Sequence, residues 1–151
     1  MHFSSSKHDV AQYLVLLQDT QLSWSDTITY LGHVLYANNN DSADISVRLN
    51  NFISQVNYFF ARFGHVSADV RSRLFNNFCT SFYGCDLWDL HHKDLASFDI
   101  AWRKAVRRLW HLPYRTHSAL LPCIMNERSF CDIICSRFNN FVSSCLKSTF
   151  V

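Results

Sequence analysis

Hydrophobic positions follow two different spacings along the chain, and the change falls near residue 40. The runs AQYLVLL (11–17) and DTITYLGHVLY (26–36) are rich in the aliphatic, aromatic and β-branched residues typical of strands. The polar stretch QDTQLSWSD (18–26) between them can carry a turn. Gly32, inside the second run, favours a bulge or a close backbone approach over a helix. We therefore expect two strands, paired as a short hairpin, within residues 1–36.

After ANNNDSAD (37–44), apolar residues recur at helical spacing. The first stripe predicts a long amphipathic helix and consists of Ile45, Leu49, Phe52, Ile53, Val56, Phe59, Phe60 and Phe63. Asp41 or Ser42 is suited to cap its start, and Gly64 stands where a helix would end.

Three further helices are expected after Gly64. The second begins after Ser67, ends at Gly84, and carries its apolar stripe at Val70, Leu74, Phe78 and Phe82. The third runs from Ser97 toward Pro113, because proline disfavours helical geometry in the residue before it. The fourth follows Pro122, with a stripe at Phe130, Ile134, Phe138, Phe141 and Cys145. The expected fold class is mainly α: a short N-terminal β-hairpin followed by a bundle of about four helices.

Composition and charge exclude several classes of protein. A chain of 151 residues has the length of one domain, and a hydrophobic content of 48% excludes a disordered protein. The net charge of +2 excludes a protein that binds polyanions over its whole surface, so such a role requires cations gathered on one face. No stretch approaches the roughly 18 apolar residues of a membrane span. Six scattered cysteines without a convincing signal peptide indicate an intracellular, reduced protein.

The stretch WRKAVRRLWHLPYRTHSALLPCI (102–124) concentrates positive charge on one predicted helix. Trp102, Val106, Leu109 and Trp110 share one face. Arg103 with Arg107, and Lys104 with Arg108, form two rows elsewhere on the helix, opposed only by Asp99. Like charges so arranged repel by a few tenths of a kcal/mol per pair, roughly, and a polyanion would relieve that repulsion. Two interpretations stay open from spacing alone: contact with phosphates, or a solvated face beside a tryptophan core.

The cysteines and histidines do not form a familiar metal or catalytic pattern. His91 and His92 are adjacent and point in different directions, and Cys79 with Cys85 lacks the short spacing of a zinc knuckle. Cys131 and Cys135 lie one helical turn apart but lack two further ligands at a known interval. We expect buried free thiols, no metal site and no catalytic residue. The sequence contains no nucleophile elbow, no Walker loop and no dinucleotide fingerprint.

Four segments in order carry a resemblance that covers nearly the whole chain. ITYLGHVL (28–35), LFNNFCTSFYGCDLWD (74–89), residues 102–124 and SRFNNFV (136–142) resemble the end of the reverse transcriptase encoded by non-LTR (LINE-type) retrotransposons. The matching residues are Tyr30, Leu31, Gly32, Tyr83, Gly84, Trp88, Arg108, Leu112, Pro113, Thr116, His117, Leu120 and Leu121. FSSSKHD (3–9) also resembles the Phe-x-x-x-Lys segment of that family, which makes Lys7 its lysine.

The resemblance implies a division into two parts and a set of contacts. Residues 1–40 would be a β segment from the palm edge, with Tyr30, Leu31 and Gly32 near the primer grip, and residues 41–151 a thumb-like helical domain. A thumb packs against the template-primer duplex, mostly on phosphates. The residues expected to make these contacts are Arg103, Lys104, Arg107, Arg108 and Arg115. Thr116 and His117 are expected to fix the loop after Pro113 by hydrogen bonding.

Polymerases of this kind hold two metal ions with carboxylates that include an adjacent Asp-Asp pair, and this sequence has none. We therefore expect a fragment without the fingers and most of the palm, inactive alone and without a cofactor, in the nucleus or the cytoplasm. Its expected partners are RNA–DNA or other duplex nucleic acid and the missing palm and fingers. Self-association with further copies of the chain is also expected, and contact with a membrane is not. The alternative is a helical protein-interaction module with no nucleic-acid role, which the excess of aromatic residues favours.

Overall fold

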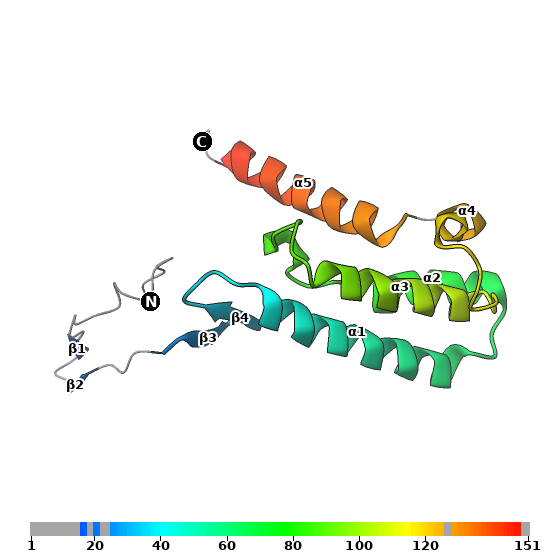
Figure 1. Cartoon of the computed structure of the whole chain (residues 1–151), viewed down its shortest axis with the longest axis horizontal. Coiled ribbons are helices and arrows are strands. Elements are labelled where there is room, and N and C mark those ends of the chain that lie inside the picture. The colour runs from blue at the N-terminus through cyan, green and yellow to red at the C-terminus, as the bar shows by residue number, and fades with distance from the viewer. Residues whose placement is uncertain (1–15, 18–19, 22–24, 126–127, 149–151) are drawn as a thin grey trace. The chain divides into compact units, whose positions relative to one another are not determined.

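The computed structural model describes residues 16–17, 20–21, 25–125 and 128–148, and it confirms the mainly helical fold with an N-terminal hairpin (Figure 1). The elements in chain order are β1 (Leu16–Leu17), β2 (Thr20–Gln21), β3 (Thr27–Tyr30), β4 (His33–Tyr36), α1 (Ser42–Phe63), α2 (Ala68–Cys79), the 3₁₀ helix η1 (Cys85–Leu87), α3 (Leu95–Leu109), the 3₁₀ helix η2 (Ser118–Leu120), α4 (Leu121–Met125) and α5 (Phe130–Ser148). The chain divides into two compact units, Met1–Asp44 and Ile45–Val151.

In the first unit, each of the two apolar runs contributes to a hairpin of its own. β1 pairs with β2, and β3 pairs with β4 in a register from Thr27↔Tyr36 to Tyr30↔His33. Leu31 and Gly32 form the turn between β3 and β4, with φ of 47° and 81°. Positive φ at both central residues is the geometry of the two-residue turn that fits the twist of a hairpin. Of the two roles expected for Gly32, the bulge is wrong, because the glycine lies in a turn. A hairpin within residues 1–36 is confirmed, but the described strands pair β1 with β2 and β3 with β4, and not one apolar run with the other.

The β4 strand is tied to the first turn of α1 by a buried carboxylate. Asp44 accepts a hydrogen bond from the backbone N–H of Val34 at 3.2 Å, and its other oxygen lies 3.2 Å from Nδ1 of His33. Asp44 is only 3% exposed, so these partners offset the cost of burying its charge. The hairpin and the first three residues of α1, up to Asp44, therefore belong together in the first unit.

The long helix α1 buries most of its predicted stripe. Ile45, Phe52, Val56 and Phe59 are buried, and the rest of the stripe except Ile53 packs partly buried against the core. Ile53 is 42% exposed, because it lies 100° around the helix from Phe52 and outside the covered face. The predicted end at Gly64 is confirmed. A Cβ on Gly64 would lie 2.6 Å from the carbonyl oxygen of Phe60, which only glycine avoids.

The predicted stripe of α2 is wrong at two of its four positions: Leu74 packs partly buried against the core, and Phe82 is buried, although it lies beyond the end of the helix. Val70 and Phe78 are exposed, and the helix buries the face of Arg71, Ser72, Phe75 and Cys79 instead. The polar identity of Arg71 and Ser72 conceals this face in the sequence. Arg71 is nonetheless accommodated, since its Nη1 donates to the carbonyl oxygen of Gly64 at 3.2 Å.

The second helix also ends at Cys79, well before the predicted stop at Gly84. The hydroxyl of Thr80 donates to the carbonyl oxygen of Asn76, and Phe82 has a positive φ of 34°, which no α-helix tolerates. Gly84 adopts the left-handed conformation predicted for a stop but precedes η1.

Aromatic rings from four helices and one loop segment meet in the centre of the second unit. Phe98 of α3 lies 5.4 Å from Phe52 of α1, 5.2 Å from Phe82 and 4.9 Å from Phe130 of α5, measured between ring centroids. Trp102 of α3 lies 5.6 Å from Phe75 of α2. Helix α3 therefore occupies the middle of the bundle, and its orientation is fixed by contacts on several sides.

The last helix, α5, is covered over its first half only. Phe130 and Ile134 are buried as predicted, whereas Phe141 and Cys145 are exposed, and so is every residue from 139 to 148. Arg137 anchors the covered half by donating to the carbonyl oxygens of Thr80 and Ser81. The predicted stripe thus continues past the helices that could bury it. In the described part of the chain, no helix is long and apolar enough to cross a membrane.

Candidate nucleic-acid interface

Helix α3 separates its buried and charged sides as the sequence predicts. Trp102, Val106 and Leu109 are buried and Trp110 is half-buried, while the four cations of residues 103–108 lie on other sides of the helix. The helix begins at Leu95 and ends at Leu109, where the residues before Pro113 leave helical geometry. Its cations are not equivalent, because three of the four are engaged by other groups of the protein.

Arg103 forms the ion pair that the sequence suggests. Its Nη2 lies 2.7 Å from Oδ2 of Asp99, one turn earlier, and its Nε donates to the backbone carbonyl of Asp99 at 3.3 Å. The pair is partly exposed, so it contributes at most about 1 kcal/mol to stability. The pair also cancels part of the positive charge that Arg103 would offer to a phosphate.

Arg107 holds the segment after the helix. Its Nε and Nη2 both donate to the carbonyl oxygen of Thr116, at 3.3 and 3.0 Å, and Nη2 also lies 3.0 Å from Oγ of Ser118. The backbone N–H of Thr116 donates to the carbonyl oxygen of Pro113 at 3.0 Å, which closes a tight turn over residues 113–116. Arg107 therefore clamps this turn to α3.

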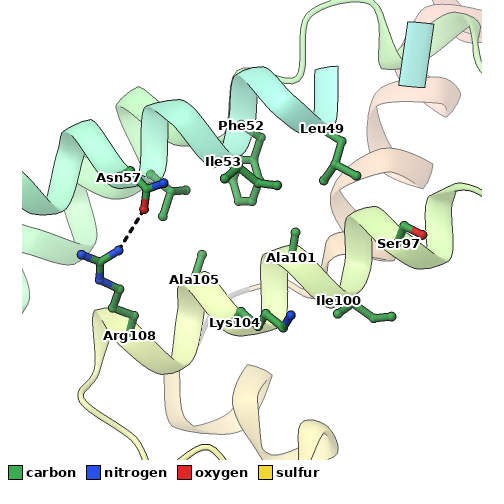
Figure 2. Close-up of a pocket in the computed structure, with 11 residues that line it drawn as sticks. Leu49, Phe52, Ile53, Asn57, Ser97, Ile100, Ala101, Lys104, Ala105 and Arg108 are labelled. Carbon is green, nitrogen blue, oxygen red and sulfur yellow. Dashed lines mark hydrogen bonds between the residues drawn. The ribbon is translucent and has the colours of Figure 1, made fainter. Parts of the chain in front are cut away.

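Arg108 reaches across to α1. Its Nη1 donates to Oδ1 of Asn57 at 3.1 Å, as the dashed line in Figure 2 marks, and its guanidinium carbon lies 4.3 Å from the ring centroid of Phe60. A guanidinium over an aromatic ring is stabilised by about 0.5–1 kcal/mol at an exposed site. Arg108 is thus a packing residue between two helices as well as a cation.

A groove of about 400 Å³ lies between α1 and α3. Figure 2 shows the side chains that line it. Leu49, Phe52 and Ile53 come from α1, and Ile100, Ala101 and Lys104 from α3. The groove is therefore apolar along its walls and has positive charge at Lys104 and Arg108. We call it the α1–α3 groove.

Lys104 and Arg115 are exposed cations of the predicted set, and neither makes a hydrogen bond or an ion pair within the described part of the chain. Both line an open hollow of about 370 Å³ between α3 and the 113–116 turn, which we call the basic depression. Its lining residues are Ile100, Arg103, Lys104, Arg107, Tyr114, Arg115, Thr116, His117 and Ser118. Four of these are cations, and none of the described lining residues is a carboxylate. The fold thus gathers Arg103, Lys104, Arg107 and Arg115 around one hollow.

His117 has the structural role that the sequence predicts. Its Nδ1 accepts a hydrogen bond from the backbone N–H of Ala119 at 3.3 Å and so caps η2. Thr116 contributes through its carbonyl group, which Arg107 binds. Because Nδ1 of His117 accepts, the neutral ring carries its proton on Nε2, and this nitrogen can donate to a ligand.

The primer-grip-like residues lie on the tip of the β3–β4 hairpin, in the other unit. Tyr30 is the last residue of β3, and Leu31 and Gly32 form the turn. Tyr30 and Leu31 are 61% and 70% exposed, so neither is a core residue in the described part of its unit. Contact with a primer stays a prediction, and Lys7 lies outside the described residues.

The cysteines and histidines give no metal centre in the described part of the chain, where no three His, Cys, Asp or Glu side chains converge. Cys79 and Cys85 are buried as predicted, and burial raises the pKa of each thiol to about 12. Cys131 and Cys135 were expected to be buried, and this is wrong: both are exposed on α5. They lie toward the outer side of a helix whose inner face is occupied by Phe130 and Ile134.

Three residues of the basic depression were not predicted from the sequence: Ile100, Tyr114 and Ser118. Tyr114 and Ser118 lie close to the basic helix in the chain, but only the tight turn brings them beside it. The available signal was the aromatic residue directly before a cation in Pro-Tyr-Arg-Thr, since aromatic side chains beside cations are used at nucleic-acid surfaces.

Comparisons with protein-family models, with curated proteins and with solved structures found no match for this chain. The likeness to non-LTR reverse transcriptases therefore rests on the sequence motifs and stays a prediction.

Proposed function

We propose that the helical unit binds the backbone of duplex nucleic acid, RNA–DNA hybrid in particular, as the thumb of a reverse transcriptase does. The observation that carries this proposal is the basic depression, where four cations from α3 and the following turn surround one hollow. Lys104 and Arg115 are exposed and available, while Arg107 is held in place by Thr116 and Ser118. Contacts to phosphates depend on charge and on the spacing of the phosphates, which every base sequence shares, so binding should be independent of base sequence.

The double substitution Lys104→Glu with Arg115→Glu tests this proposal. The variant should bind a fluorescein-labelled RNA–DNA hybrid more weakly than the parent, since two phosphate contacts are lost and two carboxylates are added. The slope of log K against log salt should flatten by about one unit per lost contact. Fluorescence anisotropy across a salt series measures both quantities. Both side chains are exposed, so circular dichroism should show the variant folded.

A matched control separates this site from general charge. Arg73→Glu with Lys147→Glu changes the net charge by the same amount on exposed positions of α2 and α5. This variant should keep the affinity and the salt slope of the parent, because salt screens charges that lie far from the bound phosphates. Equal losses in the two double variants would contradict a local phosphate site. Arg108 is unsuitable for this test because it packs between α1 and α3.

The isolated chain should not extend a primed template with Mg²⁺ and nucleotides. Phosphoryl transfer of this kind requires carboxylates that hold two metal ions, and the sequence lacks the adjacent Asp-Asp pair. Incorporation of labelled nucleotide, compared with a buffer control, is the measurement. Template-dependent incorporation would overturn the proposal that the chain only holds the duplex.

A second candidate function is supported by the α1–α3 groove: a protein-interaction module without a nucleic-acid role. Its apolar walls include the exposed side chains of Ile53 and Ile100. Apolar association persists at high salt, whereas phosphate binding weakens steeply. The salt series above therefore distinguishes the two functions in one experiment.

A further inference from the structure

Tyr114 is the most exposed of the large apolar and aromatic side chains in the described part of the helical unit, at 78%. Exposure alone does not indicate a function, since single apolar residues at the surface are common. Tyr114, however, lines the same depression as the four cations, and Arg115 follows it directly. An open aromatic ring and several cations thus face one hollow.

The ring of Tyr114 is also open in a way that other exposed tyrosines of this unit are not. The guanidinium of Arg62, on the same helix, lies over the ring of Tyr58, with its carbon 5.5 Å from the ring centroid. Arg48 is 5.1 Å from the centroid of Tyr83. Among the described residues, no ring or guanidinium stacks on Tyr114, although three arginines line the same hollow.

The position of Tyr114 is fixed by the turn that carries it. Tyr114 and Arg115 occupy the two central positions of the turn closed by Thr116 and Pro113, and Arg107 binds the carbonyl group of Thr116 with two N–H groups. A side chain displayed on a clamped turn loses little freedom when a ligand binds. The turn therefore presents its aromatic ring and its cation together.

We propose that the basic depression binds a nucleotide whose base is unpaired, with its phosphate between Lys104 and Arg115 and its base stacked on Tyr114. This inference rests on the proposed function, because it assigns a ligand to the same site. Bases inside a duplex are already stacked on both faces, whereas bases of a single strand offer a free face to an aromatic side chain. The chain should therefore bind an RNA–DNA hybrid with a single-stranded overhang more tightly than the blunt hybrid.

The test compares oligothymidylate with an abasic strand of the same length, which keeps every phosphate and lacks every base. The parent protein should bind oligothymidylate roughly 5- to 150-fold more tightly, the factor expected for one stacked base. Tyr114→Ala should lose this preference and keep the salt slope, because no charge is removed. Tyr114→Phe should retain it, and Tyr58→Ala is the matched control on α1.

Two outcomes would overturn the inference: equal affinity of the parent for the two strands, or a preference that survives in Tyr114→Ala. Failure of the underlying phosphate site looks different. In that case the Lys104→Glu, Arg115→Glu variant would bind the RNA–DNA hybrid with the salt slope of the parent. If replacing the two cations weakens binding but removing the bases from the strand does not, the proposed function stands and only the stacked base is contradicted.

Discussion

Replacing Phe98 by alanine should lower the free energy of unfolding by about 3–5 kcal/mol, the range measured for large aromatic residues in cores. Phe98 is fully buried, and its ring contacts those of Phe52, Phe82, Trp88 and Phe130. These rings come from α1, α5 and the segment between α2 and α3, so a cavity at this point weakens the packing of the whole bundle. Urea unfolding followed by circular dichroism measures the change.

Phe78→Ala is the matched control for this substitution. Phe78 lies on the exposed side of α2, and among the described residues its one ring contact is with Phe63, at 6.3 Å between centroids. We expect a loss of about 1 kcal/mol or less, because little apolar surface is removed from the core. The comparison also tests the side of α2 that faces the core. Equal costs for the two variants would contradict the burial of Phe98 and the exposure of Phe78.

Long apolar stripes could be predicted from the sequence because many residues agree on one face. Helix α1 is 22 residues long, and its start near Ser42 and its end at Gly64 followed from the periodicity and from one glycine. Helix α2 has 12 residues and fewer apolar positions, so its periodicity placed Val70 and Phe78 on the buried face, although both are exposed. The buried face of α2 includes Arg71, whose burial depends on a carbonyl group of the preceding loop.

The position of the turn between β3 and β4 could not be predicted from the spacing of apolar residues. The turn between β3 and β4 places Leu31 at positive φ, where leucine is unfavourable and glycine or asparagine is common. The hairpin pairing of the flanking residues holds the leucine there, and a single sequence carries no signal of that pairing. Tertiary context therefore decided the fold of the hairpin.

The sequence predicted which cations belong to the candidate site, but not which of them are free to contact a phosphate. Five cations were expected to face phosphates, but Arg108 contacts Asn57, which lies 51 residues earlier. Such a contact depends on the packing of two helices and leaves no mark on local spacing. The ion pair of Arg103 with Asp99 was visible, since the two residues lie one turn apart. What remained hidden was the turn that carries Tyr114.

Stability should fall steeply in alkaline solution because of two buried thiols. Cys79 and Cys85 are at most 1% exposed, and burial raises the pKa of each from 9.0 to about 12. Below pH 9 both thiols are protonated in the folded and the unfolded protein, so they contribute no dependence on pH. Above pH 9 the unfolded chain releases protons that the folded chain keeps, so unfolding is favoured as pH rises.

The expected loss is on the order of 1 kcal/mol per thiol for each pH unit between about 9 and 12. Urea midpoints measured across this range give the slope. The variant Cys79→Ala with Cys85→Ala should be less stable at neutral pH because of the cavities it creates, yet its stability should fall less steeply above pH 9. Cys123→Ala, an exposed position on α4, should keep the slope of the parent. Parallel slopes for the parent and the double variant would mean that the two thiols do not control the alkaline transition.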